Sequence, residues 1–251
     1  MSNMFFLQVT RSQYLSSLRP ALSSSFNSFA TKACLALILA ILLSLFFSFA
    51  QASAASAKVN VKQIEQKVKK GEKLYQQCVA CHGDKGQGND VLNAPRLAGQ
   101  YAWYIQRQLK NFSQELRGKH NKDLPGLPMI AIAKNLTEVD VSALSVYISQ
   151  LSGSTPYNNQ SPPLGDMKNG SRYYQAKCGA CHGGKAQGNK AFNAPKLAQQ
   201  SDAYLQRQMN HFTQGIRGTA QIDKFGRQMA MMAKIVSAKE LNDIMFYISK
   251  Q

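Results

Sequence analysis

The end of the chain carries an apolar stripe at helical spacing, and the same stripe occurs one hundred residues earlier. Its members stand at i, i+3, i+4 and i+7: Leu144, Tyr147, Ile148 and Leu151, then Leu241, Ile244, Met245 and Ile248. This spacing is typical of an amphipathic helix with one buried face. A capping-box pair precedes each stripe, Thr137 with Asp140 and Ser237 with Glu240. The pattern therefore predicts a helix at the end of each half.

Two further helices are predicted in each half. Similar spacing marks a middle helix: Ile105, Leu109, Phe112 and Leu116, repeated as Leu205, Met209, Phe212 and Ile216. A first helix runs into a cysteine pair over residues 64–77 and 167–177, where Gly71 and Gly170 would let a neighbouring helix come close. No segment alternates apolar and polar residues for long enough to be a strand, so we expect an all-α fold.

The chain contains an internal repeat with a period of one hundred residues. From Cys78 onward, CVACHGDKGQGNDVLNAPRLAGQ returns as CGACHGGKAQGNKAFNAPKLAQQ, and 31 of the 74 positions in 78–151 equal their partners. A solenoid has units of about 20 to 50 residues and needs at least three copies, so two copies of this length indicate two similar domains. Ser, Pro, Gly and Asn crowd between them. We expect domains at 53–151 and 167–251, joined by a linker at 152–166.

The N-terminus has the layout of a secretory signal peptide. Residues 1–52 hold three basic residues and no acidic one, followed by an apolar run over 33–50 and by small residues suited to cleavage after Ala52. The run reaches the lower limit of about 18 residues for a membrane span, so an uncleaved anchor stays open as an alternative. Both readings place the remainder of the chain outside the cytoplasm.

Composition and charge narrow the class of protein and of partner. The 251 residues are 44% hydrophobic and 17% charged, which is typical of a globular chain. Thirty Lys and Arg against thirteen Asp and Glu give +17, and the chain after Ala52 keeps 27 of these basic residues and all thirteen acidic ones, a net +14. We expect an acidic protein surface or an anionic membrane face as partner. Export argues against nucleic acid.

Each half carries the sequence C-x-x-C-H, at residues 78–82 and 178–182. This is the signature of covalent haem attachment, because two thiols one helical turn apart can add to the two vinyl groups of a porphyrin while the adjacent His reaches the iron. A zinc ribbon or a dithiol redox motif fits poorly, since the pairs are far apart and lack a βαβ pattern. A structural disulfide leaves the histidines unexplained. The sequence predicts two covalent c-type haems, attached through Cys78, Cys81, Cys178 and Cys181.

The sixth ligand of each iron decides between electron transfer and ligand chemistry. Met129 is the one Met between His82 and the linker, and its repeat partner is Met229. Met231 and Met232 have partners, Ala and Ile, that cannot bind iron. Filling core gaps is the ordinary role of Met. The two haem motifs nevertheless favour Met129 and Met229 as candidate ligands.

Other repeated residues suggest supporting roles. The turns at 93–95 and 193–195, both Asn-Ala-Pro, are rigid and could offer a carbonyl to the N–H of the axial imidazole. His120 and His211 are not repeat partners, and we expect both to be exposed. The repeated basic residues either pair with haem propionates or form solvated helix faces. They are Lys85 and Lys185, Arg107 and Arg207, and Arg117 and Arg217.

With these motifs assembled, residues 60–251 resemble the dihaem cytochromes c of the cytochrome c4 type, which have two class I cytochrome c domains in tandem. The matching pieces are the C-x-x-C-H sites, NAPRLAGQ and NAPKLAQQ, FSQELRG and FTQGIRG, and the late Met before a capped final helix. One departure is that KHNKDLPGLP before Met129 differs from AQIDKFGRQ before Met229, so the two haems need not share a potential. The resemblance implies axial pairs His82 with Met129 and His182 with Met229, and Pro95 and Pro195 as the carbonyls that the histidines contact.

The resemblance also implies a function. It indicates a periplasmic carrier that passes single electrons between a respiratory donor and a terminal oxidase and is not an enzyme, with membrane association left open. Its partners would be a terminal oxidase and a membrane cytochrome complex or dehydrogenase. One alternative is an electron-accepting dihaem subunit of a periplasmic dehydrogenase. A dihaem peroxidase is a further alternative, but it needs an iron with an open face, against which two methionine ligands argue.

Overall fold

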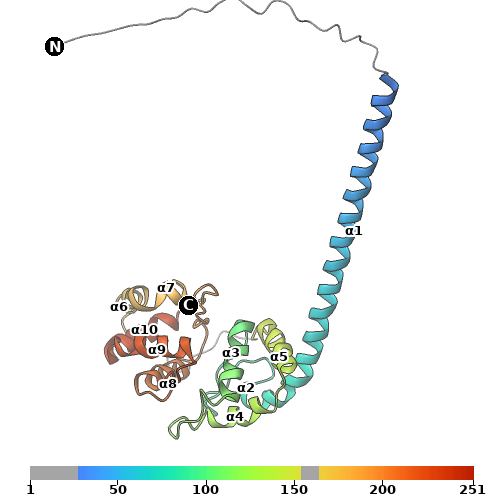
Figure 1. The fold of residues 1–251 in the computed structure, drawn as a ribbon. Coiled ribbons are helices and arrows are strands. Elements are labelled where there is room, and N and C mark those ends of the chain that lie inside the picture. Colours follow the sequence, from blue (N-terminus) through green and yellow to red (C-terminus); the bar gives the residue numbers. More distant parts are fainter. Residues whose placement is uncertain (1–27, 154–163) are drawn as a thin grey trace, which may run out of the picture. The chain divides into compact units, whose positions relative to one another are not determined.

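The computed structural model describes residues 28–153 and 164–251. The first half of the predicted signal peptide and most of the predicted linker therefore lie outside the described residues. Within these ranges the chain is helical, and the only β-type pairings are two isolated bridges, Asn89 with Ala94 and Asn189 with Ala194. This confirms the all-α prediction (Figure 1). None of the described helices has the length and hydropathy of a membrane span.

Residues 58–251 form one compact unit that holds both copies of the repeat. The first copy consists of the end of α1 (Ser28–Tyr75), a 3-10 turn (Gln76–Cys78), α2 (Val79–His82), α3 (Ala102–Ser113), α4 (Leu127–Lys134) and α5 (Glu138–Gln150). The second consists of α6 (Met167–Tyr174), a π-helical turn (Gln175–Gly179), α7 (Ala180–His182), α8 (Asp202–Thr213), α9 (Lys224–Lys234) and α10 (Ala238–Ile248). The element order is thus the same in both copies.

Each copy has its own apolar core, built from the predicted stripes. In the first copy α3 packs against α4 and α5, and in the second α10 packs against α6 while α8 packs against α9. Two glycines allow the closest approaches, because a Cβ on Gly71 would collide with the carbonyl of Ala143, and one on Gly170 with that of Asp243. The final helix of each copy is therefore held tightly against its first helix.

Both predicted capping boxes are present, at Thr137 with Asp140 and at Ser237 with Glu240. The middle helices end earlier than the stripe suggests, because Leu116 lies three residues past the end of α3. Helices α4 and α9 were not predicted from the pattern. They are short, and α4 is apolar on most of its surface, so it shows no amphipathic period.

Candidate haem sites

The axial-histidine candidate of each copy stands at the end of a short helix, followed by a glycine that turns the chain. Helix α2 ends at His82, and Gly83 follows with φ of 80°, a left-handed conformation that favours glycine. The loop then folds back, with the Gly88 amide donating to the His82 carbonyl at 2.9 Å. The second copy repeats this arrangement at His182 and Gly183.

The returning loop brings a proline carbonyl to each imidazole. His82 Nδ1 lies 2.9 Å from the Pro95 carbonyl oxygen, and His182 Nδ1 lies 2.9 Å from that of Pro195. A carbonyl oxygen only accepts hydrogen bonds, so Nδ1 carries the proton in both rings. Each Nε2 then has a lone pair available for a metal ion.

Burial sets the protonation of the attachment motifs. It lowers the pKa of His82 and of His182, and the bond to the proline carbonyl only partly opposes this effect. Both imidazoles are therefore neutral at pH 7. Burial also raises the pKa of the Cys78 and Cys178 thiols to about 11.

A cavity of about 650 Å³ is lined by residues of both copies. Most of its lining is apolar, and both copies contribute two thiols, one imidazole and the thioether of the Met that is repeated at positions 129 and 229. These groups belong to Cys78, Cys81, His82 and Met129 of the first copy and to Cys178, Cys181, His182 and Met229 of the second. The structure thus brings together residues that lie almost fifty positions apart in each copy.

The structure narrows the choice of methionine ligand in the second copy but leaves more than one candidate in the cavity. Met129 on α4 and Met229 on α9 both line the cavity. Met231 is 64% exposed on the outer face of α9, whereas Met232 lines the cavity beside Met229. Met231 is therefore unsuited to bind an iron in the cavity. Met232, on the same helix as Met229, is its nearest competitor in sequence, and Met209 and Met245 line the cavity from α8 and α10.

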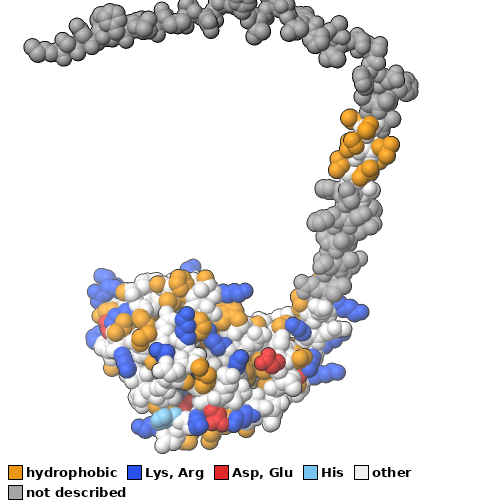
Figure 2. All heavy atoms as spheres, viewed as in Figure 1, with side chains coloured by type: hydrophobic (Ala, Val, Ile, Leu, Met, Phe, Trp, Pro, Cys, Tyr) orange, Lys and Arg blue, Asp and Glu red, His pale blue; other side chains and the backbone are white. Residues whose placement is uncertain are grey.

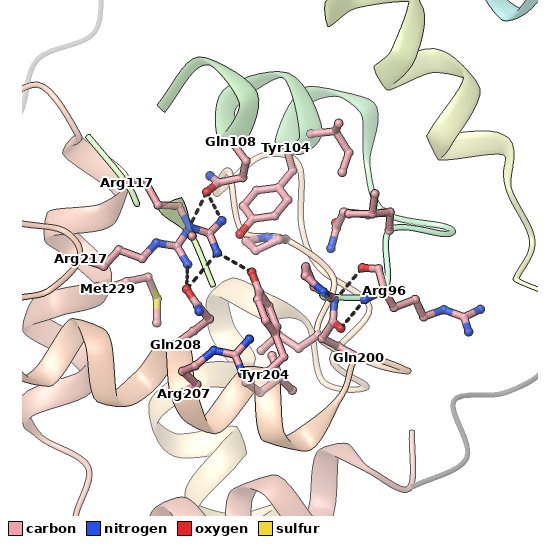
Figure 3. A pocket seen from close by; sticks show the side chains of 18 of the residues that line it. Arg96, Tyr104, Gln108, Arg117, Gln200, Tyr204, Arg207, Gln208, Arg217 and Met229 are labelled. Carbon is pink, nitrogen blue, oxygen red and sulfur yellow. Dashed lines mark hydrogen bonds between the residues drawn. The ribbon is translucent and has the colours of Figure 1, made fainter. Parts of the chain in front are cut away.

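Two buried arginines lie where the copies meet (Figure 3). Arg117 donates to Gln108 at 2.9 Å, to Gln208 at 3.1 Å and to the Tyr204 hydroxyl at 2.8 Å. Arg217 donates to Gln208 at 2.6 Å and to Gln108 at 2.8 Å. None of these acceptors is a carboxylate, so the two guanidinium charges lie close together without a hydrogen-bonded carboxylate, and they lower the pKa of the Tyr204 hydroxyl against the effect of burial.

The charge of these two arginines shows whether a haem would suit the cavity. Arg117 and Arg217 line it, and the Nε atom of each has no hydrogen-bond partner among the described residues. Buried charges require a counter-charge, and a porphyrin that carries propionates supplies one. Together with the thiols, imidazoles and thioethers, the buried arginines fit two haem groups.

Some of the basic residues and histidines that the sequence predicted to be exposed are buried in the structure. Lys85 and Lys185 are exposed, but the alternative of a solvated face is wrong for the buried Arg117 and Arg217. His120 is exposed as expected. The expectation for His211 is wrong.

His211 is 5% exposed, and its Nδ1 lies 3.8 Å from the carboxylate of Asp123 in the other copy. Burial lowers the pKa of His211, and Asp123 opposes this effect. The part of α8 that carries Gln208 and His211 is thus covered by the first copy.

Sequence reasoning missed the glutamines at this junction. Gln108 and Gln208 bridge the two arginines, and Gln100 and Gln200 bond to the main chain of the opposite copy. Each pair is identical across the repeat, and this identity was the available signal.

Comparisons with known proteins agree with this geometry. The Cytochrome c family profile matches residues 68–152 and 167–251. The chain is 34% identical to cytochrome c4 of Stutzerimonas stutzeri over 42% of this chain and 50% of that protein. It is 33% identical to a thiosulfate dehydrogenase electron acceptor of Thiomonas intermedia over 56% of this chain and 64% of that protein. The crystal structure of reduced cytochrome c4 from Pseudomonas stutzeri matches with a TM-score of 0.56 and 27% identity, covering 71% of this chain and 95% of that one.

Proposed function

The chain belongs to the cytochrome c family, as two tandem domains with two c-type haems, and on this premise we propose that it carries single electrons between a respiratory donor and a terminal oxidase in the periplasm. It is an electron-transfer protein and not an enzyme. The observation that carries the proposal is the presence, on the wall of the cavity, of the imidazole and the repeat-equivalent Met thioether of each copy. Two retained ligands leave an iron no open position for a substrate.

The residues of each copy have distinct roles in this proposal. Cys78 with Cys81, and Cys178 with Cys181, would hold the two haems covalently, and each bound iron supplies one-electron redox chemistry. His82 with Met129 would ligate the first iron, and His182 with Met229 the second. The carbonyls of Pro95 and Pro195 accept from the histidines and fix the orientation of the rings.

The proposal includes the processing and division of the chain. We place a cleaved signal peptide at 1–52, the two haem domains at 53–151 and 167–251, and the linker at 152–166. Support comes from the apolar run before Ala52 and from family matches that begin at residues 68 and 167. An electron-accepting subunit of a dehydrogenase is the second candidate, because one relative is named a thiosulfate dehydrogenase electron acceptor.

The reduced holoprotein is expected to bind carbon monoxide poorly at neutral pH. If Met129 and Met229 remain bound, neither iron has a position for an added ligand. The measurement is a carbon monoxide titration followed in the visible absorption bands. Rapid binding of one or two equivalents by the unmodified protein would contradict the carrier function and favour an enzyme with an open iron.

Electron transfer to the true partner is expected to slow as ionic strength rises. Residues 167–251 contain thirteen Lys and Arg and four Asp and Glu, a net +9. Three of these carboxylates, Asp202, Asp223 and Asp243, are buried, and Glu240 is paired with Lys177. Basic side chains are more numerous than acidic ones on the face in Figure 2. A cationic surface steers an acidic partner, and salt screens this attraction over about 10 Å at 0.1 M.

The measurement is the second-order rate of electron transfer against salt concentration for the wild type and matched variants. Lys185→Glu and Lys85→Glu replace exposed, repeat-equivalent lysines and should reduce the rate and its salt dependence. Gln206→Ala changes an exposed neutral residue and should leave both unchanged. A wild-type rate that does not vary with salt would remove electrostatic steering from the proposal.

A further inference from the structure

The peptide group that contacts the axial-histidine candidate of the first copy is held by the second copy. In the peptide that joins Pro95 to Arg96, the carbonyl oxygen accepts from His82 Nδ1 at 2.9 Å. The N–H of the same peptide donates to Gln200 Oε1, also at 2.9 Å, and Gln200 Nε2 donates to the Arg96 carbonyl at 2.9 Å. Figure 3 shows this paired contact between Arg96 and Gln200.

The second copy has the reciprocal arrangement. The carbonyl of the peptide that joins Pro195 to Lys196 accepts from His182 Nδ1 at 2.9 Å. The N–H of that peptide donates to Gln100 Oε1 at 3.2 Å, and Gln100 Nε2 donates to the Lys196 carbonyl at 2.9 Å. One glutamine of each copy therefore hydrogen-bonds to the histidine-contacting peptide of the other copy.

The orientation of both glutamine amides is fixed by their own main chain. Gln100 Oε1 also accepts from the Tyr101 amide at 3.0 Å, and Gln200 Oε1 from the Ser201 amide at 3.0 Å. Each amide oxygen thus receives two N–H donors, which a flipped amide could not accept. The glutamines are built into the junction as acceptors for the histidine-contacting peptides.

Such a chain of hydrogen bonds changes the acceptor strength of the carbonyl. When a peptide N–H donates to an acceptor, the whole amide polarises and its carbonyl oxygen becomes more negative. A more negative oxygen strengthens the bond from the imidazole Nδ1–H, which makes Nε2 more basic. A more basic imidazole stabilises the ferric state and lowers the reduction potential.

We propose that Gln200 and Gln100 are positioning residues that each set the reduction potential of the haem in the opposite copy, through the peptide that contacts the axial histidine. The proposal rests on the proposed function in one respect, that His82 and His182 ligate the irons. Gln200 belongs to the second copy and acts on the first haem, the one attached at Cys78 and Cys81. The contact between the two copies thereby influences the axial histidine of both irons.

Two arginines also hydrogen-bond to the Asn-Ala-Pro turns, but replacing them is a less direct test of the hydrogen-bond chain. Arg207 donates to the Asn93 carbonyl and side chain at 2.8 Å, and Arg107 donates to the Asn193 carbonyl at 2.9 Å. Removing either one also removes a positive charge near a haem, and this lowers a potential independently of the hydrogen bond. A neutral glutamine isolates the effect of the hydrogen-bond chain.

The test measures the potentials of both haems in the holoprotein of Gln200→Leu and Gln100→Leu, with Gln206→Leu as the control. Gln200→Leu should raise the potential of the first haem and leave the second unchanged, and Gln100→Leu should show the reverse pattern. The shift should be larger for Gln200→Leu, because its bond to the peptide N–H is shorter. Gln206 is exposed and contacts only Asn242 of its own copy in the described residues, so its replacement should shift neither potential.

A second measurement reports on the hydrogen bond itself. The Nδ1 proton of the histidine in the opposite copy should exchange faster with solvent in each glutamine variant, as followed by proton NMR. Gln200→Ala and Gln100→Ala repeat both experiments should the leucine variants fail to fold.

The outcomes separate the inference from the proposed function. Unchanged potentials, a shift in the haem of the same copy, or equal shifts in both haems would overturn the inference, the last because it indicates a general loosening of the junction. If the unmodified protein does not show a His/Met spectrum, the assignment of the axial ligands is wrong, whatever the glutamine variants do.

Discussion

Met129→Ala is expected to convert a protein that excludes carbon monoxide into one that binds a single equivalent, at the first haem. Met129 lines the cavity from α4, and no other Met lies between His82 and the end of the first copy. An Ala side chain cannot reach an iron, so the variant should gain an open position. The potential of the first haem should also fall, because a thioether ligand favours the ferrous state. Carbon monoxide titration and a redox titration that resolves both haems measure the two effects.

The second copy supplies the matched comparison. Met229→Ala should open the second iron in the same way, while Met231→Ala should open neither, because Met231 is exposed on the outside of α9. Met232 also lines the cavity, so Met232→Ala distinguishes the two assignments. Carbon monoxide binding in Met232→Ala, with Met229→Ala closed, would assign Met232 as the ligand and show that the repeat misleads at this position.

Elements with a regular period could be predicted from the sequence. Helices α5 and α10 carry a clear apolar stripe and a capping box, and both signals depend only on neighbouring residues. Helix α4 was missed for the opposite reason, whereas α9 is amphipathic and was missed although its period was present in the sequence. Helix α4 has eight residues and Pro128 in its first turn, and the need to fill the space around the cavity outweighs any local period.

In the candidate sites, too, some features follow from the local sequence and others depend on how the chain folds. The two thiols and the imidazole of each copy stand in five consecutive residues, and covalent chemistry requires that spacing. The carbonyl of Pro95 comes from a loop whose return depends on Asn93 in a left-handed conformation, with φ of 55°, and on the bridge between Asn89 and Ala94. Asn-Ala-Pro indicated a turn, and the hydrogen bond to His82 depends on how that turn folds back.

The junction between the copies could not be predicted from either copy alone. Arg117 and His211 lie outside the apolar stripes, and both are buried because the other copy covers them. A periodic pattern reports which face of a helix is apolar. It does not report which polar face meets a second polar surface. Gln108 and Gln208 are identical across the repeat, but identity alone does not reveal the contact, because Gln206 is also identical to its partner Gln106 and is exposed.

Arg117→Met is expected to lower the free energy of unfolding of the holoprotein by about 3 kcal/mol, the size of effect seen when one partner of a buried charge pair is removed. The change removes the hydrogen bonds to Gln108, Gln208 and Tyr204. It would also remove a buried cation that could balance a haem propionate, and an unpaired buried charge is costly. Met is similar in length to the arginine stem, so the loss of packing is small. Denaturant unfolding measures the change.

The control for this prediction is Arg227→Met, because Arg227 is exposed and its side chain hydrogen-bonds only to Gln221 among the described residues. Its replacement should change the free energy of unfolding by less than about 0.5 kcal/mol, as is usual for surface positions. The reduction potentials add a second readout. Removing a buried positive charge from a cavity that serves both haems should lower both potentials, whereas Arg227→Met should lower neither. Equal stability of the two variants would mean that propionates do not balance the charge of Arg117, and that the two buried guanidiniums merely repel each other across the junction.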